Sequence, residues 1–153
     1  MSTPFPPPPC STKPGKPPPP ASVTTMPGTR DARALLAPDD FSAVTATVTA
    51  HNPRMDCFLA ERVVLEALKS VATAAESSES IAPSHLVDKG WHALILHTAL
   101  YQRLCSRLGG FVDHDPGPHG PPGNSSNSID RTVSSIELAG FPVDRNLWQA
   151  QAW

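Results

Sequence analysis

The sequence lacks any long hydrophobic run and any strong excess of charge. No stretch approaches the eighteen or so consecutive apolar residues of a membrane-spanning helix. The formal net charge is -2, from 12 basic and 14 acidic side chains that are spread along the chain. Because no run of Lys or Arg is present to bind phosphates or an anionic lipid surface, we expect neither a nucleic-acid nor a membrane partner.

The sequence is also poor in cysteine and shows no export signal. The N-terminus has neither a basic region nor the apolar stretch of a signal peptide. Cys10, Cys57 and Cys105 are odd in number, have unrelated spacings and form no CxxC pair. We therefore expect a cytoplasmic protein with reduced thiols.

Proline is abundant, and it is concentrated in the segment "MSTPFPPPPCSTKPGKPPPPASVTTMPGTR". Proline lacks a backbone donor, excludes helix and favours extended polyproline II, so residues 1–30 are predicted to form a disordered arm. "PFPPPP" and "KPGKPPPP" could bind an SH3-like or WW-like groove, although a solvated tail is the commoner role of such a composition.

Residues 31–148 are predicted to form one all-α domain of about four helices, and residues 149–153 a frayed terminus. The first helix should begin at Pro38, with Asp39 and Asp40 near the positive end of its dipole, and end at "HNP". The alternation in "SAVTATVTA" is also compatible with a strand.

The second predicted helix is "DCFLAERVVLEALKSVATAA", which carries an apolar stripe at helical spacing. The stripe consists of Leu59, Val63, Val64, Leu68 and Val71. The charged residues expected to lie largely away from it are Glu61, Arg62, Glu66 and Lys69.

A third, central helix is predicted from the N-cap Ser84 to Leu108, with Gly109 and Gly110 as its stop. Its stripe of about seven turns consists of Val87, Trp91, Leu94, Thr98, Tyr101, Cys105 and Leu108. A fourth helix, "IDRTVSSIELAG", should start near Ser128. The following "FPVDRNLW" should form a turn with a short helical end, and its residues expected to close over the core are Phe141, Leu147 and Trp148.

The central helix carries the residues with chemical potential. Asp88 and His92 lie one turn apart, so the carboxylate can orient His92 as a base or as a metal ligand, although the same pair also stabilises helix surfaces without further role. On a regular helix His97 points about 140° away from His92, and Cys105 lies about 20 Å from His92. Neither residue could therefore share one metal ion with His92 on an unbroken helix.

His114 follows the helix by a tether of at most about 17 Å, which reaches Tyr101 and Cys105 more easily than His92. Zinc or iron bound by Cys105 and His114 would need further ligands, for which the nearby residues are Asp113, Asp115 and His119. The commoner role of Trp91, Tyr101 and Cys105 on an apolar stripe is as core residues.

"VDKGWHALILHTALYQRLCSRLGGFVDHDP", followed by "TVSSIELAGFPVDRNLW", resembles a family of small actinobacterial proteins that are loosely similar to glycine-rich domain-containing proteins. The resemblance covers roughly residues 35–148. The matching positions are Val87, Asp88, Trp91, His92, Thr98, Tyr101, Cys105, Phe111, His114 and Pro116. This chain has Asp113 where the family often has a histidine, and it lacks the Cys/His-rich tail of many members. Both departures count against metal binding.

Three functions follow as hypotheses. The first is a non-catalytic binding or accessory module that reaches a protein partner through the Pro-rich arm or the helical domain, with Asp88, Trp91, His92 and Tyr101 as candidate binding residues. The second is a metal-binding protein that holds zinc or iron through Cys105 and His114, or through His92 with Asp88. The third is an enzyme that uses His92 as acid or base.

Overall fold

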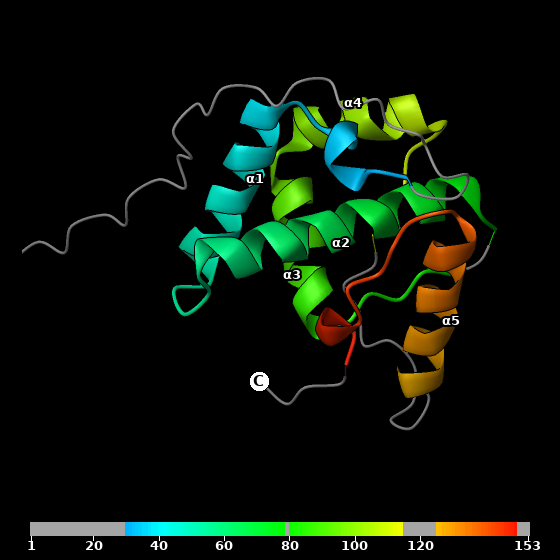
Figure 1. Cartoon of the computed structure of the whole chain (residues 1–153). Helices are drawn as coiled ribbons and strands as arrows, with labels where there is room; N and C mark the ends of the chain where they lie inside the picture. Colours follow the sequence, from blue (N-terminus) through cyan, green and yellow to red (C-terminus); the bar gives the residue numbers. More distant parts are fainter. Residues whose placement is uncertain (1–29, 79, 115–124, 150–153) are drawn as a thin grey trace, which may run out of the picture.

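The computed structural model describes residues 30–78, 80–114 and 125–149, and these ranges contain helices and no strand. The all-α prediction is therefore confirmed (Figure 1). The elements in chain order are η1 (Ala32–Leu35), α1 (Pro38–His51), α2 (Cys57–Glu76), α3 (His85–Leu96), α4 (Thr98–Leu108), α5 (Ser125–Leu138) and η2 (Arg145–Leu147). The predictions for the arm up to residue 29, for Asp115, Pro116 and His119, and for residues 150–153 lie outside the described residues.

The first two helices lie within one residue of the predicted boundaries. α1 begins at Pro38 and is helical throughout, so the strand interpretation of this segment is wrong. The helix accommodates its buried Thr45 because the Thr45 hydroxyl donates to the carbonyl of Phe41 at 2.8 Å. α2 begins after Asp56, whose Oδ1 accepts from the backbone N–H of Leu59 at 2.8 Å.

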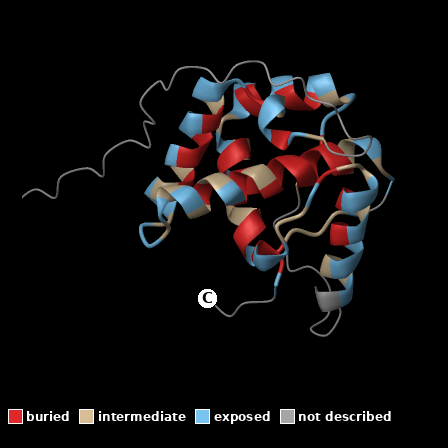
Figure 2. Cartoon of the chain, viewed as in Figure 1, coloured by how far each residue is buried: buried red, intermediate tan, exposed pale blue. Residues whose placement is uncertain are grey.

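α2 is the centre of the fold, because α1, α3, α4, α5 and η1 all pack against it. Figure 2 shows the resulting band of buried residues along this helix. α3 lies close to α2 at Gly90, where an added Cβ would lie 2.8 Å from the carbonyl oxygen of Val63. A glycine at this point lets the two backbones come within van der Waals contact.

The predicted central helix from Ser84 to Leu108 is wrong in one respect, because it is broken at His97. This residue has φ -86° and ψ 70°, outside the helical region, and its Nε2 lies 2.7 Å from the hydroxyl of Thr47 on α1. The carbonyl of His97 accepts from the N–H of Tyr101 at 2.8 Å and so starts a new helix. α4 therefore takes a direction different from that of α3 (Figure 1).

The C-terminal part returns to α2. α5 begins at Ser125, earlier than predicted, and ends before Gly140, which has a positive φ of 96°. The short helical end is present as η2. The three residues predicted to close over the core, Phe141, Leu147 and Trp148, are all buried.

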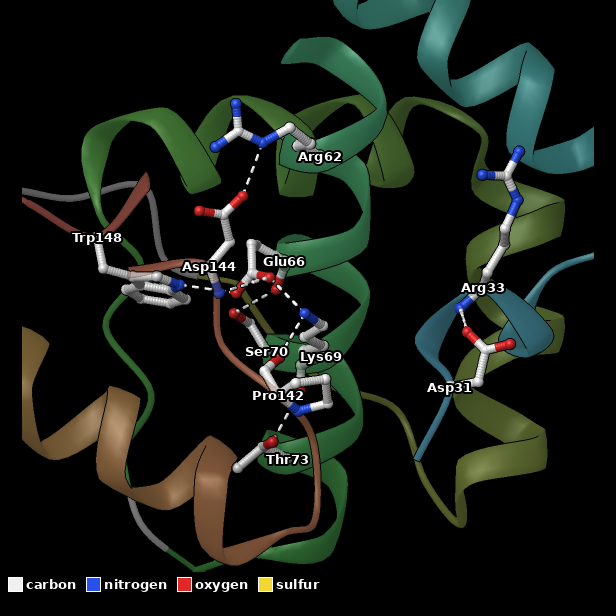
Figure 3. Close-up of polar contacts among 10 residues, drawn as sticks. All are labelled: Asp31, Arg33, Arg62, Glu66, Lys69, Ser70, Thr73, Pro142, Asp144 and Trp148. Atoms are coloured by element: carbon white, nitrogen blue, oxygen red, sulfur yellow. Dashed lines mark hydrogen bonds and ion pairs between the residues drawn. The ribbon is translucent and has the colours of Figure 1, made fainter. Parts of the chain in front are cut away.

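This return covers the polar face of α2, so the prediction that Glu66 and Lys69 lie away from the core is wrong. Glu66 is 1% exposed, and its Oε2 accepts from the indole Nε1 of Trp148 at 2.8 Å (Figure 3). The Lys69 ammonium donates both to Glu66 Oε1 and to the carbonyl of Pro142. Arg62 bonds Asp144 at the edge of this network and holds the pKa of that carboxyl below its usual value.

The cysteines differ in state. Cys105 is a buried free thiol, as expected for a core residue. Cys57, at the start of α2, is disulfide-bonded, so the expectation of reduced thiols is wrong for this residue. Among the described residues, no helix combines the length and the apolar character that crossing a membrane requires.

Candidate metal centre

Three side chains converge beside α3: Asp88, His92 and His114. Each offers one ligand atom, and these atoms all lie within 4.8 Å of one another. Asp88 Oδ2 is 3.1 Å from His92 Nε2, and Asp88 Oδ1 is 2.7 Å from His114 Nε2. The carboxylate thus lies between two imidazoles.

Two of the three residues are placed by one turn of α3. Asp88 and His92 are four positions apart, which puts both on one face of the helix. The start of this helix is fixed by Ser84, whose hydroxyl oxygen accepts from the N–H of Val87 at 3.2 Å and donates to the carbonyl of Leu147 at 2.6 Å. The C-terminal segment therefore supports the element that carries the site.

His114 reaches the same place from the segment after α4. The expectation that its tether reaches Tyr101 and Cys105 more easily than His92 assumed an unbroken helix. The break at His97 redirects α4, and Gly109, with a φ of 109°, ends that helix and lets the chain turn. No proline or glycine stands near His97, so the residues around it offer little signal for the break.

A chain of buried polar and ring contacts holds the segment that precedes His114. The Tyr101 hydroxyl donates to the carbonyl of Val112 at 2.6 Å and accepts from the indole Nε1 of Trp91 at 3.1 Å. The His114 ring stacks on Trp91, with ring centroids 4.5 Å apart and planes inclined by 24°. Burial raises the pKa of Tyr101, so this hydroxyl remains protonated and continues to donate.

The three side chains differ in exposure, which increases from His114 through Asp88 to His92. The His114 side chain is 4% exposed, that of Asp88 is 30% exposed and that of His92 is 50% exposed. The centre is therefore closed on the His114 side and open to solvent on the His92 side.

The spacing of the ligand atoms suits one small ion. Zinc bonds to histidine nitrogen and carboxylate oxygen are about 2.0–2.2 Å long, so two ligands of one ion lie about 3 Å apart. The Asp88–His92 contact of 3.1 Å already has this separation, and a slight opening of the Asp88–His114 contact would give it too. Two histidines with one carboxylate are also the ligand set of non-heme iron sites.

The other predicted site residues lie around this centre or apart from it. Trp91 and Tyr101 are buried and position His114, as described above. Cys105 is buried in the core and is not part of the three-residue group, and Asp113 is exposed. The sequence singled out each of the three converging residues, but it did not place His114 with the other two.

The role of Tyr101 can be tested by Tyr101→Phe. We expect a loss of about 1–2 kcal/mol in the free energy of unfolding, because the indole N–H of Trp91 and the carbonyl of Val112 lose their partner in a buried site. Urea unfolding measures this loss. Gln102→Ala, at an exposed position of the same helix, should change the stability by less than about 0.5 kcal/mol. Equal stability of the two variants would contradict the role of this hydroxyl.

Comparisons of the chain with protein-family models, with curated proteins and with solved structures find no match. The function is therefore argued from the residues and geometry of the site.

Proposed function

We propose that this protein binds one divalent transition-metal ion, zinc or iron, through Asp88, His92 and His114. The observation that carries the proposal is the convergence of these three side chains, from a helix and from a separate segment, on one point. Their donor set, two imidazoles and a carboxylate, is one that both zinc and ferrous iron accept.

Two details of the centre support an ion over a plain Asp-His contact. Asp88 Oδ1 is buried, and its 2.7 Å contact with His114 Nε2 is an ion pair rather than a well-aligned hydrogen bond. A buried carboxylate oxygen normally has a hydrogen-bond donor or a metal ion next to it. In addition, one ion pair needs only one imidazole beside the carboxylate, and here there are two. The two imidazoles and the carboxylate together supply three of the four ligands of a zinc site.

The proposal gives the ion a binding and structural role. It would connect α3 to the segment before residue 115, and such a link suits a non-catalytic accessory module. The resemblance to glycine-rich domain-containing proteins and a protein partner for the module stay predictions. A cytoplasmic location also stays a prediction.

The test is the metal content of untagged protein, measured by plasma mass spectrometry on the wild type and on His114→Ala. We expect close to one zinc or iron per chain in the wild type and its loss in the variant, because the remaining Asp88 and His92 provide only two ligands.

Two control variants make the result specific. Cys105→Ala removes the cysteine that the sequence suggested as a ligand, and His51→Ala removes an exposed histidine outside the three-residue group. Both should keep the metal. Wild-type protein that contains no stoichiometric metal, even after incubation with Zn²⁺ or Fe²⁺, would refute the proposal, and so would His114→Ala protein that retains it.

A further inference from the structure

A small pocket adjoins the open side of the proposed metal centre. Its volume is about 240 Å³, and Asp88 and His92 form part of its wall. The remaining wall comes from the end of α1 and from the same face of α3. These residues are Val48, His51, Asn52, His85, Lys89, Ala93 and Leu96.

Unfilled coordination positions of an ion at the centre would be directed into this pocket. Three protein ligands leave one position of a tetrahedral ion and three positions of an octahedral ion. His114, which is 4% exposed, closes one side, whereas His92, at 50%, borders the pocket. An exogenous ligand would therefore approach from the pocket side.

The pocket wall favours an anion. Among the described residues that line it, Asp88 carries the only carboxylate, and that carboxylate is a proposed metal ligand, so the bound ion would offset its charge. Lys89 supplies a positive charge, and its Nζ is held at the wall by a bond of 2.8 Å to Asn52 Oδ1. Because an ammonium has three donor protons, Lys89 can bond Asn52 and still donate to a ligand.

The size of the pocket restricts the ligand to a small molecule. At about 30 Å³ for each water in the liquid, 240 Å³ corresponds to roughly eight waters. Pockets for drug-sized molecules begin at about 300 Å³, so this pocket by itself surrounds only a smaller ligand. The aliphatic side chains of Val48, Ala93 and Leu96 suit a short hydrocarbon part.

On these grounds we infer that the pocket binds a short-chain carboxylate, with one carboxylate oxygen on the metal ion and the other accepting from Lys89. This inference rests on the proposed metal-binding function. It adds a ligand class and assigns Lys89 as a ligand-binding residue.

The experiment uses the full chain loaded with Co²⁺, whose visible absorption reports changes in coordination, and acetate as the probe. Acetate should change the spectrum of the wild type in a saturable manner. Lys89→Met, which keeps the length of the side chain and removes its charge, should raise the acetate dissociation constant about fivefold. Arg103→Met removes an exposed positive charge on α4, outside the pocket wall, and should leave that constant unchanged within about twofold.

The outcomes distinguish a failure of carboxylate binding from a failure of the proposed metal binding. If the wild type binds no Co²⁺, the metal-binding function itself fails. If Co²⁺ binds stoichiometrically and His114→Ala abolishes that binding, but acetate leaves the spectrum unchanged, only the carboxylate site is refuted. A spectral response that Lys89→Met and a second variant, Lys89→Gln, both leave unaltered would overturn the assignment of the carboxylate to this pocket.

Discussion

Glu66→Ala is expected to lower the free energy of unfolding by about 3–5 kcal/mol. This is the cost usually found when one partner of a buried ion pair is removed. Glu66 is 1% exposed, and its carboxylate neutralises the ammonium of Lys69, which is itself buried. Without Glu66 that positive charge would remain in the interior, where the ammonium would still donate a hydrogen bond to the carbonyl of Pro142.

The same substitution should loosen the C-terminal segment. Glu66 accepts from the indole of Trp148 at 2.8 Å and from the backbone N–H of Asp144 at 3.3 Å (Figure 3). These bonds fasten residues 141–148 to α2, which is the contact that buries Phe141 and Leu147. We therefore expect part of the destabilisation to come from exposure of this segment.

Urea unfolding of Glu66→Ala beside Glu61→Ala measures the effect. Glu61 lies on the same helix, is partly exposed and has a contact of 4.0 Å with Arg33, so its removal should cost less than about 1 kcal/mol. A loss below about 1 kcal/mol in Glu66→Ala as well would show that the buried network contributes little. Glu66→Gln, which keeps the shape and one acceptor, should lie between the two.

Gly90→Ala is expected to destabilise the protein by about 3 kcal/mol, although alanine is the better helix former by about 1 kcal/mol. The added Cβ would lie 2.8 Å from the carbonyl oxygen of Val63 and 3.0 Å from the Cβ of Ala67. A backbone oxygen cannot rotate away as a flexible side chain can, so α2 and α3 would have to move apart. Because α3 carries Asp88 and His92, the proposed metal binding should weaken too.

Thermal or urea unfolding of Gly90→Ala beside Gly110→Ala provides a matched pair. Nothing lies within 4 Å of a Cβ added at Gly110, and that residue has no positive φ, so its substitution should be close to neutral. A stability for Gly90→Ala equal to or above that of the wild type would mean that α2 and α3 are not packed as closely as described.

Local patterns were sufficient to predict most of the helices. Pro38 and Asp56 set the starts of α1 and α2 because an N1 proline and a capping aspartate act within one turn. The apolar stripe of α2 was predicted to face the core, and of its members Val63, Val64, Leu68 and Val71 are buried while Leu59 is partly buried. The pairing of Asp88 with His92 also followed from spacing alone, since residues four positions apart in a helix share a face.

What the sequence left undecided depends on contacts between distant segments. The burial of Glu66 and Lys69 follows from residues 141–148 covering α2, and no local pattern of α2 encodes that cover. The break at His97 coincides with its contact to Thr47, fifty positions earlier.

The same distinction applies to the candidate metal centre. By itself the sequence determined an all-α protein with an Asp-His pair on one helix. Only the tertiary structure decided that His114 joins that pair, because its position depends on the change of direction at His97 and on the stacking of its ring on Trp91. Helix spacing is a property of neighbours along the chain, whereas a site built from two segments exists only once the chain has folded back on itself.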